Sequence, residues 1–279
     1  MRDIADTVVL VTGSTDGLGR AVAERLAADG ATVLLHGRDP VKLASTAHDL
    51  RSTSHNDRVR TYLADFSSLK AVRVMANEVE AENHRLHVLI NNAGVGSGKP
   101  AGTTRQQSAD GFELRFAVNY LATFALTSRL LPLLRRSAPA RIVNVASAGQ
   151  YPIDFDDVML EREYDGARAY RQSKLAQIMF GFSLADRLPA DEVTVNSLHP
   201  ATFMPTKIVL DQHGHSVDSL EEGVDATLRL AVGTDLEGVT GRYFNRQDDA
   251  RADEQAYEAD ARRRLWELTA ELTGEPAAV

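Results

Sequence analysis

The sequence predicts an α/β fold, a doubly wound parallel sheet of about seven strands with helices on both faces. Three observations support this prediction: short β-branched runs alternate with longer helical patterns, the runs show no polar alternation, and a glycine-rich turn follows the first run. Strands that are buried on both faces read as continuous apolar runs, and strands that alternate with helices form right-handed crossovers. The predicted strands are Val8–Val11, Thr32–Leu35, Val59–Leu63, His87–Ile90, Arg141–Val145, Glu192–Asn196 and Arg242–Phe244.

Length and composition indicate one soluble domain over residues 1–279. The chain is 43% apolar and 25% charged, and no internal repeat, low-complexity tract or linker divides it. Its 31 Lys and Arg residues against 39 Asp and Glu give a net charge of −8, which disfavours a nucleic-acid partner. Because cysteine is absent, disulfides, thiol nucleophiles and thiolate metal sites are excluded.

The apolar pattern also disfavours a membrane partner. No stretch approaches the roughly 18 continuous apolar residues of a membrane span. Met1–Asp6 lacks the apolar core of a signal peptide and leads directly into the first strand. We therefore expect a cytoplasmic protein.

The first strand leads into a turn, Thr12–Gly19, and a helical stretch follows at once. Glycine permits positive φ and lets the backbone approach a ligand closely. The free N–H groups and dipole of the following helix favour a pyrophosphate. The spacing Gly-x-x-x-Gly-x-Gly in a first βαβ unit therefore indicates dinucleotide binding, although turn geometry alone would also require glycine.

The second strand ends in His36-Gly37-Arg38-Asp39, where a bound adenosine ribose is expected. An acidic residue there would favour NAD, whereas the Arg38 guanidinium suits the 2′-phosphate of NADP. NADP is therefore the favoured cofactor and NAD the alternative. In the structural alternative Arg38 is an ordinary surface residue. Asp39 followed by Pro40 predicts a helix N-cap.

Polar residues follow three further strands. Asp65 follows the third, Asn91–Gly94 the end of the fourth, and Ser147 the fifth, while Asn119 lies in the helix after the fourth. Because the carboxyl ends of parallel strands meet at one edge, these groups are expected in one crevice. Taken alone, Ser147 could bond its own backbone and Asn119 could be a satisfied helix residue.

Tyr170 and Lys174 lie near the start of a helical stretch that runs to Leu188. Residues four apart share a helix face, so the phenol and the ammonium can converge. A nearby cation lowers the pKa of a phenol from about 10 toward the working range. The pair therefore indicates a proton-transfer site, and its weight comes from the other motifs around it.

With these ordered motifs the sequence resembles the short-chain dehydrogenase/reductase family in its single-domain form, over about residues 7 to 245. The resemblance implies a Rossmann-type sheet and hydride transfer between NADP(H) and a small-molecule carbonyl or alcohol. It implies that Asn119, Ser147, Tyr170 and Lys174 form the catalytic tetrad. The cofactor contacts expected from the motifs and the resemblance are Gly13, Ser14, Thr15, Gly17, Leu18, Gly19, Arg38, Asp65, Asn92, Ala93, Gly94, Tyr170, Lys174, Pro200 and Thr202.

The resemblance also implies a role for each catalytic residue. Ser147 donates to the substrate carbonyl, and Tyr170 gives its proton to the forming alkoxide. Lys174 lowers the pKa of the tyrosine and bonds the nicotinamide ribose, and Asn119 holds a water that links Lys174 to solvent. In alcohol oxidation Tyr170 is the base.

Two segments outside the regular pattern, 149–166 and 201–222, are expected to be substrate-side loops. The length of the first and the Leu265-Trp266 ending are similar to the retinol-dehydrogenase-like branch of the family. That branch often handles lipophilic substrates, so we expect an apolar or bulky one.

The second loop departs from the family pattern. Ala201 stands where a glycine is usual, and Thr206 lies one position later than the usual threonine, which leaves the path of this loop open. Residues 248–279 are expected to be a C-terminal helical appendage with a solvated face.

Several alternatives remain open at this stage. The enzyme could instead reduce an activated C=C bond, or the chain could be a non-catalytic NADP-sensing protein of the same fold. A homo-oligomer is compatible with the sequence, because many relatives pair through the helix that bears Tyr170. No metal site is expected, since the polar residues around 154–157 and 213–215 lack a complete ligand set.

Overall fold

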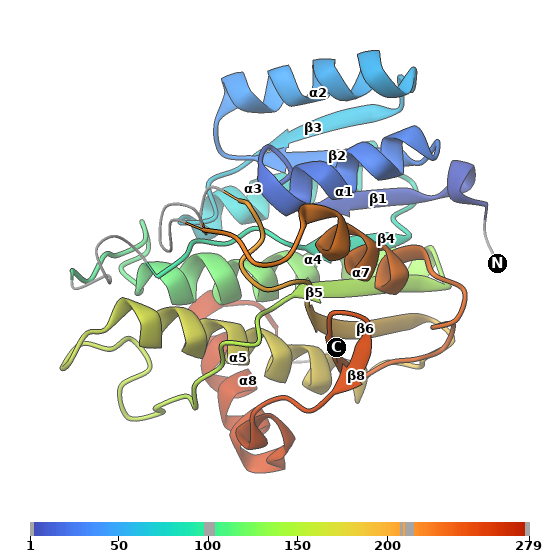
Figure 1. Ribbon diagram of the computed structural model, residues 1–279. Coiled ribbons are helices and arrows are strands. Elements are labelled where there is room, and N and C mark those ends of the chain that lie inside the picture. Colours follow the sequence, from blue (N-terminus) through green and yellow to red (C-terminus); the bar gives the residue numbers. More distant parts are fainter. Residues whose placement is uncertain (1–2, 98–103, 207–208, 210–214, 277–279) are drawn as a thin grey trace.

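The computed structural model describes residues 3–97, 104–206, 209 and 215–276. Within them the chain forms an eight-stranded sheet in the order β3-β2-β1-β4-β5-β6-β7-β8 (Figure 1). The strands pair in parallel except for β7 and β8, which are antiparallel. Their bounds are β1 Val8–Val11, β2 Thr32–Gly37, β3 Val59–Leu63, β4 Val88–Asn91, β5 Ala140–Val145, β6 Val193–His199, β7 Arg242–Asn245 and β8 Asp248–Ala250.

Helices cover both faces of the sheet, which confirms the predicted doubly wound α/β fold. On one face lie α1 (Gly17–Ala28), α2 (Pro40–Ser54) and α7 (Leu220–Val232). On the other lie α3 (Leu69–Glu82), α4 (Ala122–Arg136) and α5 (Gly166–Ala185), with α8 (Ala259–Thr273) packed outside α5. Shorter helical segments are η1 (Ile4–Asp6), η2 (Phe116–Leu121) and η3 (Glu254–Tyr257).

The continuous apolar runs arise because successive residues of each inner strand enter two different cores. In β1, Leu10 joins the core under α3 and α4, whereas Val9 and Val11 join the core under α1 and α7. All three are fully buried. Since side chains alternate between the faces of a strand, burial on both faces leaves no polar position.

The C-terminal edge of the sheet differs from the prediction. A helical appendage was expected from residue 248, but Asp248–Ala250 forms β8, which turns back on β7 through Arg246 at φ 57. This short strand covers the otherwise open edge of β7. The sequence of β8 is charged, only three residues long and without a strand pattern, so the strand was not predicted. Helical structure begins after it, with η3 and α8.

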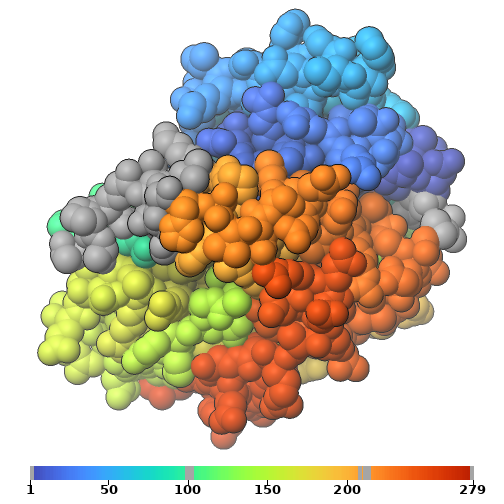
Figure 2. Space-filling model, in the orientation of Figure 1, coloured from blue at the N-terminus to red at the C-terminus, as the bar shows by residue number. Residues whose placement is uncertain are grey.

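The two predicted loops lie on the same side of the molecule. Residues 149–165 form turns and bends up to the start of α5. The second loop ends earlier than expected, because Ser219 and Glu222 form a capping box that starts α7 at Leu220. Residues 207–208 and 210–214 of this loop, and 277–279 at the C-terminus, lie outside the described residues. In Figure 2 the orange surface after β6 separates the blue N-terminal units from the yellow-green surface near α5.

One helical segment has the length and composition of a membrane span. Phe116–Arg136 has 21 residues and a mean hydropathy of 1.2, but 83% of its apolar window is buried inside the fold. It comprises η2 and α4 and packs between α3 and α5.

Candidate active site

The predicted site residues gather at the carboxyl ends of the parallel strands, around the point where the strand order reverses between β1 and β4 (Figure 1). Gly13 follows β1, Asn92 follows β4 and Ser147 follows β5. Tyr170 and Lys174 lie in the first half of α5. Open parallel sheets bind ligands at such a switch point.

The turn after β1 is shaped by glycine. Gly13 and Gly17 have φ of 65° and 52°, in the left-handed region. A Cβ at Gly13 would lie 2.8 Å from Ala93 Cα, and a Cβ at Gly19 would lie 2.3 Å from Asn92 Nδ2. The Asn92 amide in turn donates to the carbonyls of Thr12 (2.8 Å) and Gly13 (3.2 Å). The turn and the segment after β4 therefore form one close-packed unit.

This turn fits the pyrophosphate of a dinucleotide. It brings the backbone into a cradle that Cβ atoms would fill, and α1 starts from it at Gly17. The amino end of a helix attracts an anion through its free N–H groups and its dipole. Thr15 lies against Gly37 at the end of β2, where a Cβ would come within 2.5 Å of Thr15 Cγ2. The cradle therefore continues from β1 toward the expected ribose position.

Two predicted cofactor contacts lie behind the turn. Ser14 is fully buried, and both its amide and its hydroxyl are bonded to the backbone of His36. The Leu18 side chain is buried beside Gly223 of α7. These side chains therefore support the cradle from within.

His36 ties the ends of three strands together. Its Nδ1 accepts from Gly13 N (3.0 Å), its Nε2 lies 3.1 Å from Ala64 O, and its ring stacks on Phe66. Because Nδ1 accepts a backbone N–H, the neutral ring carries its proton on Nε2 and donates it to Ala64. Burial lowers the pKa of His36 to about 4. From the sequence, this position was notable only because it carries no carboxylate, and the contacts of His36 were not predicted.

We expect the His36 contacts to weaken in acid. Its pKa is 6.5 in the unfolded chain and about 4 in the fold, so the unfolded chain binds the proton more tightly. The stabilisation is complete above pH 6.5 and is lost as the pH falls through 4, and it amounts to about 3 kcal/mol. Urea unfolding at pH 7 and pH 4.5 should show a smaller acid loss for His36→Asn than for wild type. His48→Asn, on the exposed face of α2, should keep the wild-type loss, and equal losses in all three proteins would refute the expectation.

At the adenosine end, Arg38 is exposed and makes no hydrogen bond or ion pair with any residue that the structure describes. Asp39 caps α2 by accepting from Val41 N (2.9 Å) and Lys42 N (3.1 Å), which confirms the predicted cap. Asp65 is exposed after β3. Arg38 is therefore a cation that is available to a ligand at the end of β2.

Ser147 and Tyr170 meet at the end of β5. Burial raises the pKa of Tyr170, and the nearby Ser147 side chain opposes this with a smaller, lowering effect. Gly149 N donates to Ser147 Oγ (3.0 Å). Two residues that sequence reasoning missed hold the Ser147 carbonyl, since Tyr243 Oη and Gln150 Nε2 each donate to it at 3.1 Å.

The Lys174 ammonium is buried in the same region. Nζ donates to Val145 O (2.7 Å) and Gln177 Oε1 (3.3 Å), and it lies 6.0 Å from the centre of the Tyr170 ring. A Cβ at Gly94 would approach within 3.7 Å of Nζ, so the segment after β4 passes close to it. Burial lowers the pKa of Lys174 to about 8.

Asn119 lies in η2, which is a π-helical turn ahead of α4. Its Oδ1 accepts from Val95 N (2.8 Å), and its Nδ2 donates to Val95 O (3.1 Å) and Ser173 Oγ (2.9 Å). Ser173 Oγ donates to Tyr170 O (2.7 Å). Asn119 therefore joins the segment after β4 to the helix that carries Tyr170, and its role in holding a water stays a prediction. Single π-turns are frequent at functional sites.

The loop after β6 brings Thr206, instead of Thr202, to the glycine turn. A Cβ at Gly17 would lie 3.1 Å from Thr206 Cγ2. The Thr202 hydroxyl faces His199 Nε2 (3.1 Å) and Arg246 Nη2 (3.5 Å), and Pro200 is buried. The cofactor contact of Thr202 stays a prediction. The position of Thr206 could not be predicted, because the sequence did not determine the path of this loop.

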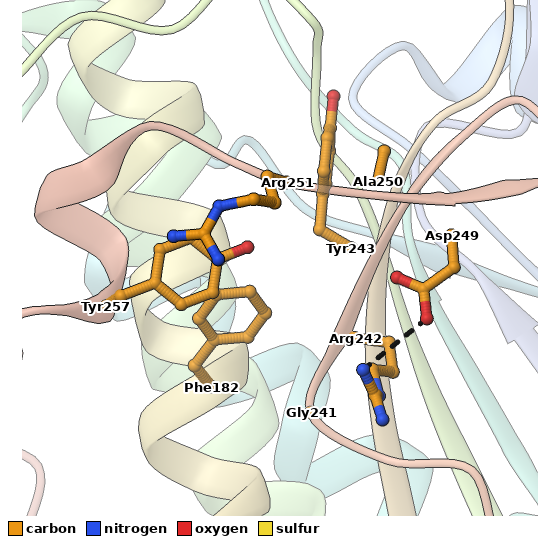
Figure 3. Close-up of a pocket in the computed structure, with 8 residues that line it drawn as sticks. All are labelled: Phe182, Gly241, Arg242, Tyr243, Asp249, Ala250, Arg251 and Tyr257. Carbon is orange, nitrogen blue, oxygen red and sulfur yellow. Dashed lines mark ion pairs between the residues drawn. The ribbon is translucent and has the colours of Figure 1, made fainter.

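Two surface cavities, of about 210 and 390 Å³, lie away from these residues. Figure 3 shows the smaller one, where Arg251 lies over the ring of Tyr257 and Arg242 pairs with Asp249. None of the four predicted catalytic residues lines either cavity. Within the described parts of the chain no cluster of three or more His, Asp or Glu residues suits a metal ion, and His213 lies outside them.

Comparisons with known proteins agree with this arrangement. Residues 7–213 match the short chain dehydrogenase family. Retinol dehydrogenase 13 from mouse is 37% identical over 97% of this chain and 85% of its own length, and human retinol dehydrogenase 11 is 36% identical over 96% and 86%.

Solved structures are also similar. A short chain dehydrogenase from Shigella flexneri, solved with NADP, has a TM-score of 0.72 and 26% identity over 89% of this chain and 100% of its own. The Pseudomonas aeruginosa RhlG/NADP complex has a TM-score of 0.69 and 28% identity over 88% and 97%. With the glycine cradle and the serine–tyrosine contact at the switch point, these matches show that the chain is a short-chain dehydrogenase/reductase of the retinol-dehydrogenase-like branch, an NAD(P)-dependent oxidoreductase.

Proposed function

We propose that this enzyme transfers a hydride between NADP(H) and a carbonyl/alcohol pair, with Tyr170 as general acid and base. The observation that carries the proposal is the convergence of the Ser147 hydroxyl, the Tyr170 phenol and the buried Lys174 ammonium at the end of β5. A bound nicotinamide supplies or accepts the hydride. The protein then has to orient the oxygen of the substrate and move one proton.

Each side chain contributes a separate part of this chemistry. Ser147 donates to the substrate oxygen, which holds the carbonyl within reach of Tyr170. The Tyr170 hydroxyl gives its proton to the developing alkoxide, and in the oxidation direction it accepts that proton. The positive charge of Lys174 stabilises the phenolate that remains, and this effect is strong because burial reduces screening by water.

The preference for NADP is supported by the free cation at the end of β2. Arg38 is exposed there, and the His36 and Gly37 positions next to it carry no carboxylate that would repel a phosphate. The Shigella flexneri and Pseudomonas aeruginosa relatives were both solved with NADP. A guanidinium binds a phosphate through two parallel hydrogen bonds.

Replacing Arg38 by Leu should lower kcat/KM for NADPH by about 10- to 100-fold, because a hydrogen bond to a charged group contributes about 1.5–3 kcal/mol. The value for NADH should change little, since NADH lacks the 2′-phosphate. Arg25→Leu removes an exposed arginine at the far end of α1 and should leave both values unchanged. An equal loss of kcat/KM with NADPH and with NADH would show that Arg38 does not bind the 2′-phosphate.

An apolar or bulky substrate is supported by two observations. The relatives at 36–37% identity are named retinol dehydrogenases. The two substrate-side loops expose aromatic side chains, Tyr151 at 43% and Phe203 at 37% of their surface. Phe203 also has a left-handed φ of 47°, a strained conformation that is concentrated at functional sites.

Initial rates with panels of aldehydes, ketones and alcohols, each with NADPH, NADH and their oxidised forms, test the proposal. We expect turnover of apolar carbonyl compounds with NADPH. Product analysis with deuterium-labelled NADPH distinguishes hydride transfer to a carbonyl carbon from transfer to an activated C=C bond. Cofactor binding without turnover across the panel would favour a cofactor-sensing protein instead.

A further inference from the structure

Gln177 is a buried polar residue next to the Tyr170–Lys174 pair. It lies one helical turn after Lys174 on α5 and is fully buried. Its Oε1 accepts from the Lys174 ammonium at 3.3 Å. Apart from the backbone carbonyl of Val145, this is the one hydrogen-bond acceptor that the described residues offer to that ammonium.

The second contact of the amide determines its orientation. Gln177 Nε2 donates to Asn91 O (3.3 Å) at the end of β4. A carbonyl can only accept, so the NH₂ group has to face Asn91 and the oxygen has to face Lys174. Asn91 is itself held by bonds from its Nδ2 to Asn144 Oδ1 (2.9 Å) and Thr127 Oγ1 (3.1 Å). The oxygen is therefore held toward the ammonium by the central sheet.

The other groups around Lys174 carry no opposing charge. Val145 O faces it from β5 and Tyr170 faces it from its own helix, and the segment after β4 passes close to it at Gly94. Burial alone lowers the pKa of Lys174, and no described carboxylate opposes this effect. The Gln177 oxygen is thus the side-chain dipole that holds the charge in place.

We propose that Gln177 is a positioning residue whose neutral oxygen sets how tightly the Tyr170–Lys174 pair holds its transferable proton. The inference rests on the proposed function. A neutral acceptor orients the ammonium and leaves its positive charge available to Tyr170. A carboxylate in this place would neutralise that charge, whereas an apolar side chain would leave the ammonium less stabilised.

Two variants that should shift the pH dependence of kcat in opposite directions test this inference. Carbonyl reduction needs Tyr170 protonated and Lys174 charged, so kcat falls at high pH. The midpoint of this fall is the apparent pKa of the two coupled groups together. In Gln177→Glu the added negative charge should raise this midpoint by about one pH unit. In Gln177→Met the lost dipole should lower it by about 0.5–1 pH unit. The KM for NADPH serves as a check that cofactor binding is retained.

Gln172→Glu is the matched control. Gln172 is buried to the same degree on the same helix, but it bonds Val158 O (2.8 Å) and Asp154 N (3.4 Å) in the loop before α5. Its midpoint should stay close to that of wild type. Thermal unfolding identifies any variant that does not fold, and the Met variant still tests the inference if the Glu variant fails.

The outcomes separate the two proposals. Midpoints that shift up in Gln177→Glu and down in Gln177→Met support the inference. A loss of packing would not make the direction of the shift depend on the charge of the new side chain. Midpoints that stay at the wild-type value, or that move in one direction together, would overturn it while leaving the catalytic proposal intact. Absence of turnover in wild type at every pH would instead overturn the proposed function.

Discussion

Replacement of Tyr170 by Phe is expected to lower kcat by about 10²- to 10⁴-fold, the range that a positioned general acid or base contributes. The change removes only the hydroxyl that lies near Ser147, and the aromatic ring remains. Ser147 and Lys174 keep their backbone contacts, so the other predicted catalytic groups should stay in place. No other described side chain at the end of β5 combines an ionisable hydroxyl with a neighbouring cation, and the lost proton transfer has no local substitute.

NADPH binding should be nearly unchanged in this variant, because the glycine cradle and Arg38 lie on other elements. Steady-state rates and fluorescence titration of NADPH measure the two effects separately. Tyr62→Phe is a matched control, since it also removes a buried phenol hydroxyl but at a bond to Glu82 (3.0 Å) on α3. Near-wild-type turnover of Tyr170→Phe would rule out Tyr170 as the acid and base.

The residues around this tyrosine were accessible to sequence reasoning because local spacing determines their positions. A Tyr and a Lys four apart on a helix share a face in any fold. Ser147 and Asn92 directly follow apolar strands, and in a parallel sheet such positions meet at one edge whatever the detailed packing. The fold class and the Asp39 cap were predictable for the same reason, since each depends on a pattern of a few adjacent residues.

The supporting residues could not be predicted because their partners are distant in the sequence. Tyr243 reaches Ser147 across 96 positions, and Gln177 reaches Asn91 across 86. No local sequence feature predicts the hydrogen-bond partner of a buried glutamine or tyrosine in an amphipathic pattern. Strand β8 was missed for a different reason, because three charged or small residues become a strand only when the edge of β7 lies next to them.

Replacement of Arg115 by Leu is expected to lower the free energy of unfolding by about 3–5 kcal/mol, the effect of breaking a buried ion pair. Arg115 and Glu113 are exposed by only 4% and 1%, and Arg115 Nη1 lies 3.3 Å from Glu113 Oε1. Arg115 also donates to Gly96 O (3.0 Å) and Ser97 O (2.7 Å), and Tyr164 Oη donates to Glu113 Oε1 (3.0 Å). The pair thus links the segment after β4 to the loop before α5.

The large effect follows from the charge that would remain. Without Arg115, Glu113 stays buried beside the start of η2, where its Oε2 accepts from Phe116 N (2.7 Å), and among the described residues no other cation forms an ion pair with it. Removing both charges avoids this penalty, so the double change Glu113→Leu with Arg115→Leu should be less destabilising than the sum of the two single changes. Urea unfolding of the three variants measures this coupling.

The exposed network on α8 is the control for this comparison. Arg263 pairs with Asp260 (3.1 Å) and Glu267 (3.4 Å), and all three side chains are more than half exposed. Since water screens such pairs, Arg263→Leu should change the free energy of unfolding very little. If Arg115→Leu were as mild as this control, or if the double variant lost the full sum, then burial of an unpaired charge would not be what makes the Arg115–Glu113 contact important.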